Sequence, residues 1–204
     1  METNIDRRSF RRKFRGTMAA RRRFRDGGPM RMLNWFLRPP LTAPNVTVLL
    51  RLMAGSVFLW EGILKLVYAS QGVGRFGKLG FPWPAETASF VAGLEIVGGL
   101  MLLAGLFTRM VAVPMMIEMI VAMLATKIAL YLGTSPLPLP AAPPQIGAWA
   151  VLHEIRSEWA QLLTTAFLFS AGPGRWSLDA WRSRARAAGQ SQLFVKQDHA
   201  LMES

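Results

Sequence analysis

Four long apolar runs constrain this chain more than any other feature. Three of them, residues 46–68, 87–107 and 110–132, are 21 to 23 residues long. At about 1.5 Å of rise per residue, a helix of that length crosses the roughly 30 Å hydrocarbon core of a bilayer. The fourth run, residues 148–171, reaches that length only when its polar first half is included. The sequence therefore predicts an all-α membrane protein, a bundle of four transmembrane helices.

Composition agrees with this class. Of the 204 residues, 51% are hydrophobic and 18% are charged, whereas a typical soluble domain carries about 25% charge. We expect three regions: a basic tail with a short interfacial helix over residues 1–40, the bundle over residues 41–174, and a C-terminal tail over residues 175–204. The interfacial helix is expected at residues 30–37, where aromatic residues lie between arginines and two prolines follow.

Positive charge is concentrated at the N-terminus. Residues 1–40 contain twelve Arg and Lys against three acids, which accounts for +9 of the total charge of +12. A polybasic segment beside a membrane span is typical of the cytoplasmic side and of attraction to anionic lipids. Since no nucleic-acid-binding fold accompanies the segment, nucleic acid is not an expected partner.

The basic residues also predict the orientation. Arginines lie in the N-terminal tail, in the turn after the second run and in the tail after the fourth run, whereas the other two loops contain only Arg75 and Lys78. The positive-inside rule then places both termini in the cytoplasm, as four crossings require.

The chain has no cysteine. Fe–S clusters, thiolate metal sites and covalently bound haem are therefore excluded. No pair of histidines suggests a haem, and no metal site is expected. His153, the only histidine near the bundle, is interpreted as an interfacial residue rather than as part of a metal site or a proton path.

Ionisable side chains interrupt the apolar runs. Charges at membrane depth are rare and mark functional sites or ion pairs between helices. Four of them share a level roughly 18–23 Å from the cytoplasmic end, at about 1.5 Å per residue: Glu61, Glu95, Arg156 and Glu158. Lys65 follows Glu61 by four residues, which suits an ion pair on one helix face.

Two interpretations of this charged layer stay open. The layer forms a polar cavity that binds a ligand or exchanges protons, or its ion pairs only fix which helices pack together. Glu118, in the third run, is either neutral or paired with Arg51. Small residues seven positions apart, such as Gly55 and Gly62, predict close approach of helices.

An ordered set of short motifs extends over residues 46–181. It consists of Leu50-Arg51-Leu52, Gly55, Gly62, Lys65, Gly93-Leu94-Glu95, Gly98-Gly99, Gly105, Thr108-Arg109, Gly172-Pro173-Gly174 and Ser177-Leu178-Asp179. In these motifs the sequence resembles the DoxX family, small four-helix membrane proteins of the bacterial inner membrane. Some members of that family are similar to subunits of thiosulfate:quinone oxidoreductases.

The resemblance implies an integral subunit of a redox-linked complex that binds quinone at the charged layer. The glutamates Glu61, Glu95 and Glu158 would exchange protons, and the implied quinone-binding residues are Arg51, Glu61, Lys65, Glu95, Arg156 and Glu158. Without cysteines, electrons would come from a partner subunit or directly from a substrate, and whether the chain is itself an enzyme stays open.

Expected partners are the bilayer, with anionic lipids at the basic tail, other membrane subunits, and a second copy of the chain. Two alternatives remain. The first is a non-catalytic structural or assembly subunit. The second is a proton-coupled carrier of small solutes, for which four helices leave little room.

Overall fold

The computed structural model describes residues 35–37, 43–186, 188 and 189. They belong to two compact units, Met1–Arg38 and Pro39–Ser204. In the first unit, residues 35–37 are helical, and the rings of Trp35 and Phe36 meet edge to face with their centroids 5.1 Å apart. The rest of the expected interfacial helix and the basic tail lie outside the described residues.

In the described part of the second unit all regular structure is helical. The helices are α3 (Thr47–Val67), α4 (Val73–Lys78), α5 (Pro84–Ala104), α6 (Thr108–Thr126), the 3-10 helix η1 (Ile128–Leu130), α7 (Ala148–Glu154) and α8 (Arg156–Ala171). Residues 178–186 form a further helix after α8.

Three helical segments are long and apolar enough to cross a membrane: Thr47–Val67, Pro84–Ala104 and Thr108–Leu130. They confirm the membrane class and the three clearest of the predicted runs. Length and hydropathy thus give three spans in the described residues where four were predicted.

The fourth predicted run is helical but interrupted. It breaks at Ile155, between α7 and α8, and α8 alone has 16 residues. The break falls in the polar half of the run, where the Arg156 guanidinium donates a hydrogen bond to the carbonyl oxygen of His153. The helix therefore breaks among the polar residues that made this run the least apolar of the four.

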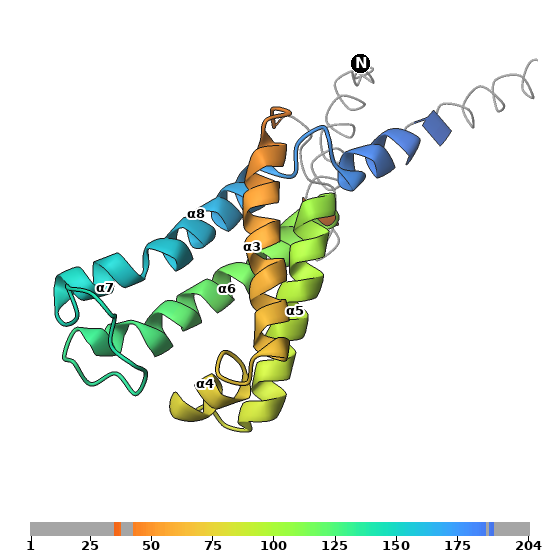
Figure 1. Ribbon diagram of the computed structural model, residues 1–204. Coiled ribbons are helices and arrows are strands. Elements are labelled where there is room, and N and C mark those ends of the chain that lie inside the picture. Colours follow the sequence, from red (N-terminus) through yellow and green to blue (C-terminus); the bar gives the residue numbers. More distant parts are fainter. Residues whose placement is uncertain (1–34, 38–42, 187, 190–204) are drawn as a thin grey trace, which may run out of the picture. The chain divides into compact units, whose positions relative to one another are not determined.

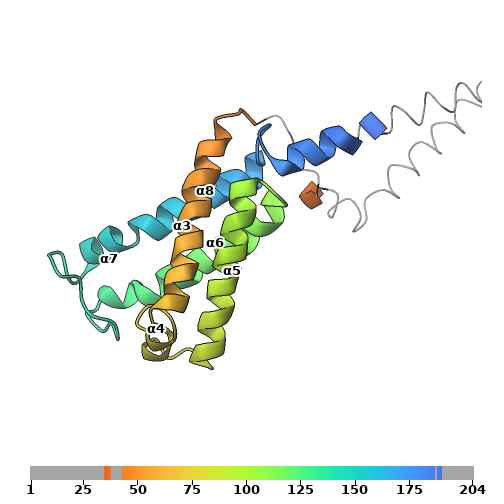
Figure 2. The same cartoon turned by 45° about the vertical axis from the view of Figure 1, so that its right-hand side comes forward.

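The long helices pack as two pairs. α3 lies against α5, and α6 lies against α8. The pairs meet where α5 turns into α6, which we call the closed end, and diverge toward α4 and α7, which we call the open end (Figures 1 and 2).

Glycines set the close approach of α3 and α5. A Cβ on Gly99 would lie 2.7 Å from the Gly55 carbonyl oxygen, and a Cβ on Gly62 would lie 2.7 Å from the Ala92 carbonyl oxygen. Only hydrogen fits at such distances, so the two backbones are in contact. The predicted role of Gly55 and Gly62 is confirmed.

A buried arginine holds the closed end together. The guanidinium of Arg51, which is 3% exposed, donates to carbonyl oxygens in two segments. Its acceptors are Leu102 and Leu103 in the last turn of α5, and Pro173 and Trp176 after α8. The last carbonyls of a helix have few partners within that helix, and Arg51 supplies donors to them. The Leu102 carbonyl oxygen also accepts the backbone N–H of Gly105.

Arg109 and Asp179 make similar contacts at the same end. Arg109 donates to the carbonyl oxygens of Phe169 and Ser170 in the last turn of α8. The Asp179 carboxylate accepts the backbone N–H groups of Phe107 and Thr108, and so caps the start of α6. Arg109 and Asp179 belong to two of the motifs that resemble the DoxX family. Their contacts show that these motifs join the ends of the helices.

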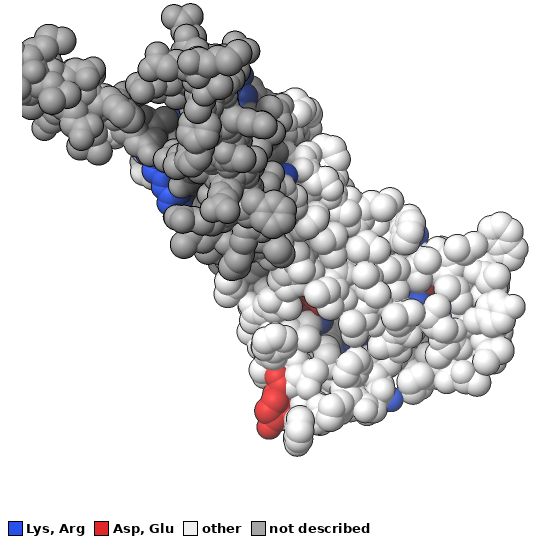
Figure 3. All heavy atoms as spheres, turned by 180° about the vertical axis from the view of Figure 1, so that it is seen from behind, with Lys and Arg blue, Asp and Glu red and all other residues white. Residues whose placement is uncertain are grey.

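The outside of the bundle suits lipid. Charged side chains are sparse on the face seen from behind (Figure 3). Exposed tryptophans lie near both ends, with Trp83 and Trp149 at the open end and Trp176 and Trp181 at the closed end. Tryptophans at two levels are typical of the two interfaces of a bilayer.

Candidate functional site

A cavity of about 340 Å³ lies between the two helix pairs. Small-molecule sites occupy roughly 300–1,000 Å³, so this cavity is at the lower end of that range. Apolar side chains of α3, α5 and α6, such as Val57, Val91 and Val121, form much of its wall. The ionisable groups in the wall are Glu61, Lys65, Arg75, Glu95, Glu118, Lys127 and Glu158.

Lys65 links α3 to α5 on one side of the cavity. Its Nζ lies 2.7 Å from both carboxylate oxygens of Glu95, a residue that is 2% exposed. The predicted pair with Glu61 is confirmed at 3.9 Å, but it is longer, and the Glu61 side chain is 50% exposed. The short buried contact therefore joins two helices, and the expected contact within one helix is secondary.

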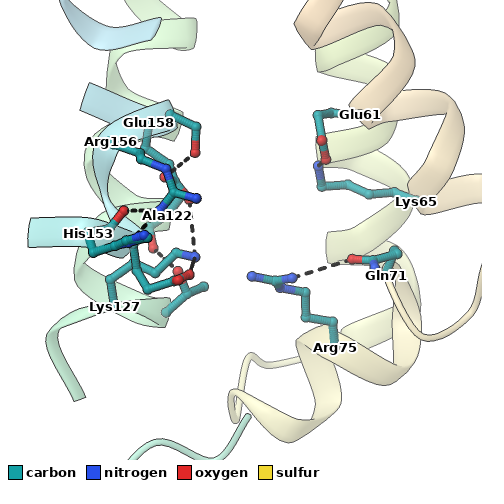
Figure 4. Close-up of polar contacts among 12 residues, drawn as sticks. Glu61, Lys65, Gln71, Arg75, Ala122, Lys127, His153, Arg156 and Glu158 are labelled. Carbon is teal, nitrogen blue, oxygen red and sulfur yellow. Dashed lines mark hydrogen bonds and ion pairs between the residues drawn. The ribbon is translucent and has the colours of Figure 1, made fainter. Parts of the chain in front are cut away.

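Lys127, the residue between α6 and η1, forms ion pairs with α7 and α8 on the other side. Its Nζ lies 3.3 Å from Glu154 and 3.6 Å from Glu158. Figure 4 shows the two lysine–glutamate groups on opposite helix pairs, with the space between the pairs separating them. Each wall of the cavity thus presents one ammonium group together with carboxylates.

Three buried oxygens in the wall accept no hydrogen bond among the described residues, and one of them, Oε2 of Glu95, is in the ion pair with Lys65. The other two, Oε2 of Glu118 and Oε1 of Gln161, have neither a hydrogen bond nor an ion pair there. Glu118 adjoins Glu95 and interacts with the charges of Lys65 and Glu61. Buried polar atoms are nearly always paired, so these two indicate a place for a further polar group. The alternative pairing of Glu118 with Arg51 is not formed, since Arg51 contacts backbone carbonyls.

The helix α4 contributes Arg75 to the site, a residue expected from the sequence only in a loop. Arg75 lies in the wall, and its Nη1 donates to Oε1 of Gln71 at 3.4 Å. The side chain points from α4 into the space between the helix pairs (Figure 4). The packed rings of Phe76 and Phe81, 5.3 Å apart, help to seat α4.

The structure brings together most, but not all, of the candidate residues. Glu61, Lys65, Glu95 and Glu158 line the cavity, whereas Arg51 and Arg156 do not. Arg51 is buried in the contacts of the closed end. Arg156 is exposed, and it also lies 3.2 Å from Nδ1 of His153.

Four wall residues are not among the candidates expected from the sequence: Arg75, Glu118, Lys127 and Gln161. For Gln161 a signal existed, because Glu154, Glu158 and Gln161 recur at helical spacing on one face of the fourth run. For Arg75 there was none, because its position depends on how α4 packs.

The wall combines groups that suit a polar ring with groups that suit proton exchange. Two ammonium groups are hydrogen-bond donors, the carboxyls are acceptors that can also carry protons, and apolar side chains form much of the remaining wall. Among the described residues, no group of three His, Asp or Glu side chains is placed to hold a metal ion.

Comparison with known proteins gives two relatives and a family. Residues 46–128, which run from the start of α3 to η1, match the DoxX family model. The uncharacterized membrane protein Rv3486 of Mycobacterium tuberculosis is 39% identical over 153 residues, which cover 72% of this chain and 87% of that protein. The putative oxidoreductase CatD of Bacillus subtilis is 32% identical over 82 residues, which cover 40% of this chain and 60% of that protein. No solved structure matches.

Proposed function

This chain belongs to the DoxX family of membrane proteins, and from that premise we propose that it is a subunit of a redox-linked complex of the bacterial inner membrane that binds a quinone between its helix pairs. One relative is named as a putative oxidoreductase, and the cavity offers a quinone the donors and the apolar walls that it needs.

The proposal includes four membrane crossings. The α7–α8 segment is the fourth, since α8 packs along α6 as α3 packs along α5. The positive-inside rule then puts both termini in the cytoplasm. The open end, with α4 and α7, faces outward, and the cavity lies in the outer half of the membrane.

The observation that carries the proposal is the pair of lysine–glutamate groups on opposite walls. A quinone ring has carbonyl oxygens at opposite edges, and both accept hydrogen bonds. Lys65 and Lys127 are donors on opposite helix pairs. The valines of α3, α5 and α6 would contact the ring and the first part of its apolar tail.

The carboxyl groups of the wall are suited to supply protons when a quinone is reduced. A bound quinone takes up two electrons and two protons on reduction to the quinol. Glu61 and Glu95 pair with Lys65, and Glu118 lies beside Glu95, so three carboxyls share one ammonium group. Such a cluster favours uptake of protons, and Glu118, with its unpartnered oxygen, is the group best placed to exchange one.

A binding measurement tests the proposal. Titration of the full chain in nanodiscs with a short-chain quinone is expected to show saturable binding. Lys127→Met is expected to weaken the affinity about tenfold or more, because a charged hydrogen bond is lost. Glu86→Gln, which changes an exposed acid outside the cavity, serves as the control. Absence of saturable binding by the natural sequence would overturn the proposal.

A second candidate is a structural or assembly subunit without a ligand. It is favoured by the fact that both lysines pair with glutamates of helices already packed against their own helix. In that case deletion of residues 1–38 weakens association with the complex, whereas Glu118→Gln leaves quinone reduction by membranes unchanged. Under the quinone proposal, Glu118→Gln slows that reduction.

A further inference from the structure

A second hollow adjoins the cavity at the open end. It has a volume of about 370 Å³ and lies between α4 and the proline-rich segment of residues 133–147. Three cations, Arg75, Lys78 and Lys127, line it, and Glu154 is the one carboxylate in its wall. Its other polar groups include the hydroxyls of Ser70 and Ser135.

Much of the positive charge in this hollow is not compensated. The ion pairs of the described bundle occupy Lys65 and Lys127, and none of them includes Arg75 or Lys78. The one hydrogen bond of the Arg75 guanidinium in this region, to Gln71, is long at 3.4 Å. A guanidinium has five donors, so most of those of Arg75 remain available to a ligand.

Arg75 and Lys78 lie together although basic residues are rare at the open end. Residues 68–83 and 131–147, which connect helices at the open end, contain no Lys or Arg other than Arg75 and Lys78. Both of these lie in one hollow. Arg75 is half-buried, where an unpaired charge is less screened than on an open surface.

We propose that this hollow binds an oxyanion, a phosphate, sulfate or carboxylate group, with Arg75 and Lys78 as its principal ligands. The guanidinium would bind two oxygens side by side, and the ammonium group a third. Ser70 and Ser135 would donate further hydrogen bonds. The oxyanion is either a free small anion or the head group of an anionic lipid, since both present the same oxygens.

The site is distinct from the quinone cavity but borders it. The two hollows share Gln71, Arg75, Thr126 and Lys127 in their walls. An anion on Arg75 therefore lies beside the mouth of the membrane cavity. The assignment does not depend on quinone binding, because it rests on the charges of the outer hollow alone.

The absence of native cysteines allows a direct test. In Thr134→Cys, an exposed position next to Ser135, an environment-sensitive fluorophore reports on the hollow. One arm titrates inorganic phosphate into the full chain in a neutral detergent. The other arm varies phosphatidylglycerol in phosphatidylcholine nanodiscs. A saturable response to phosphate assigns a free anion, and a response to phosphatidylglycerol alone assigns a lipid head group.

In the arm that responds, the double variant Arg75→Gln/Lys78→Gln is expected to weaken the affinity about tenfold or more, because charged hydrogen bonds are lost. Arg175→Gln is the matched control, since it removes an exposed arginine near the closed end and should leave the affinity unchanged. The proposal is overturned if neither probe gives a saturable response, or if the double variant responds like the natural sequence.

Discussion

Lys65 lies between two glutamates of very different exposure. Glu95 is 2% exposed and contacts the Lys65 ammonium at 2.7 Å, whereas the Glu61 side chain is 50% exposed and lies 3.9 Å away. Buried ion pairs are costly to break because removal of one partner leaves the other charge uncompensated. Exposed pairs contribute little. The two glutamates should therefore differ in what they contribute to stability.

Glu95→Gln is expected to lower the free energy of unfolding by about 3 kcal/mol, since Lys65 loses its buried partner. Glu61→Gln is expected to cause a much smaller loss. Unfolding in mixed micelles, followed by circular dichroism, measures both, with Glu86→Gln as a control. Equal losses for Glu61 and Glu95 would show that the buried contact does not dominate.

For these side chains the sequence indicated one of the two ion-pair partners of Lys65 but not the buried one. The spacing of Glu61 and Lys65 predicted a pair, and that pair exists. The shorter contact with Glu95 depends on how α5 packs against α3, and glycines on both helices allow that close approach. Arg51 was expected to donate to a ligand, and it lies instead among carbonyls that only the folded chain brings together.

At the scale of elements, α3 and α5 form the closest helix pair. A Cβ on Gly99 would lie 2.7 Å from the Gly55 carbonyl oxygen and 2.8 Å from the Leu59 nitrogen. Backbone atoms cannot move aside as a flexible side chain can. The Lys65–Glu95 contact depends on this approach, because both residues lie further along the same two helices.

Gly99→Ala is therefore expected to destabilise the protein by about 1–3 kcal/mol through overpacking. Gly93→Ala, on the same helix with nothing within 4 Å of its added Cβ, is expected to be neutral or to stabilise by up to about 1 kcal/mol. Thermal unfolding of both variants in one detergent gives the comparison. If both glycines tolerate alanine equally, the helices do not pack as described.

The long apolar runs predicted α3, α5 and α6 but not α4 or the break between α7 and α8. The segment between α3 and α5 was expected to be a connection, and it contains α4, which carries Arg75 and Lys78. The break at Ile155 was not predicted either. Short helices and breaks have little hydropathy signal, since their positions depend on contacts with the long helices.

For the molecule as a whole, the membrane topology depends on whether α7 and α8 together cross the bilayer. If α7 and α8 cross the membrane, the segment before them and the helix after them lie on opposite sides. Exposed positions in each, Thr134 and Ala185, are suitable for single cysteines because the chain has none of its own.

We expect Thr134→Cys to react with a membrane-impermeant maleimide in intact cells, and Ala185→Cys to react only after permeabilisation. This result follows from four crossings with both termini in the cytoplasm. Reaction of both cysteines from the same side would instead mean three crossings, with α8 outside the membrane.

A quinone bound in the cavity between the helix pairs is the centre of the proposed function, and photo-crosslinking tests for it directly. A photoreactive quinone added to the chain in nanodiscs, followed by mass spectrometry, is expected to modify peptides that contain wall residues of α6 and α8, such as Ala122 and Gln161. Unlabelled quinone should suppress these adducts. Adducts confined to outward-facing positions such as Phe90 and Leu132, and unaffected by unlabelled quinone, would contradict the account.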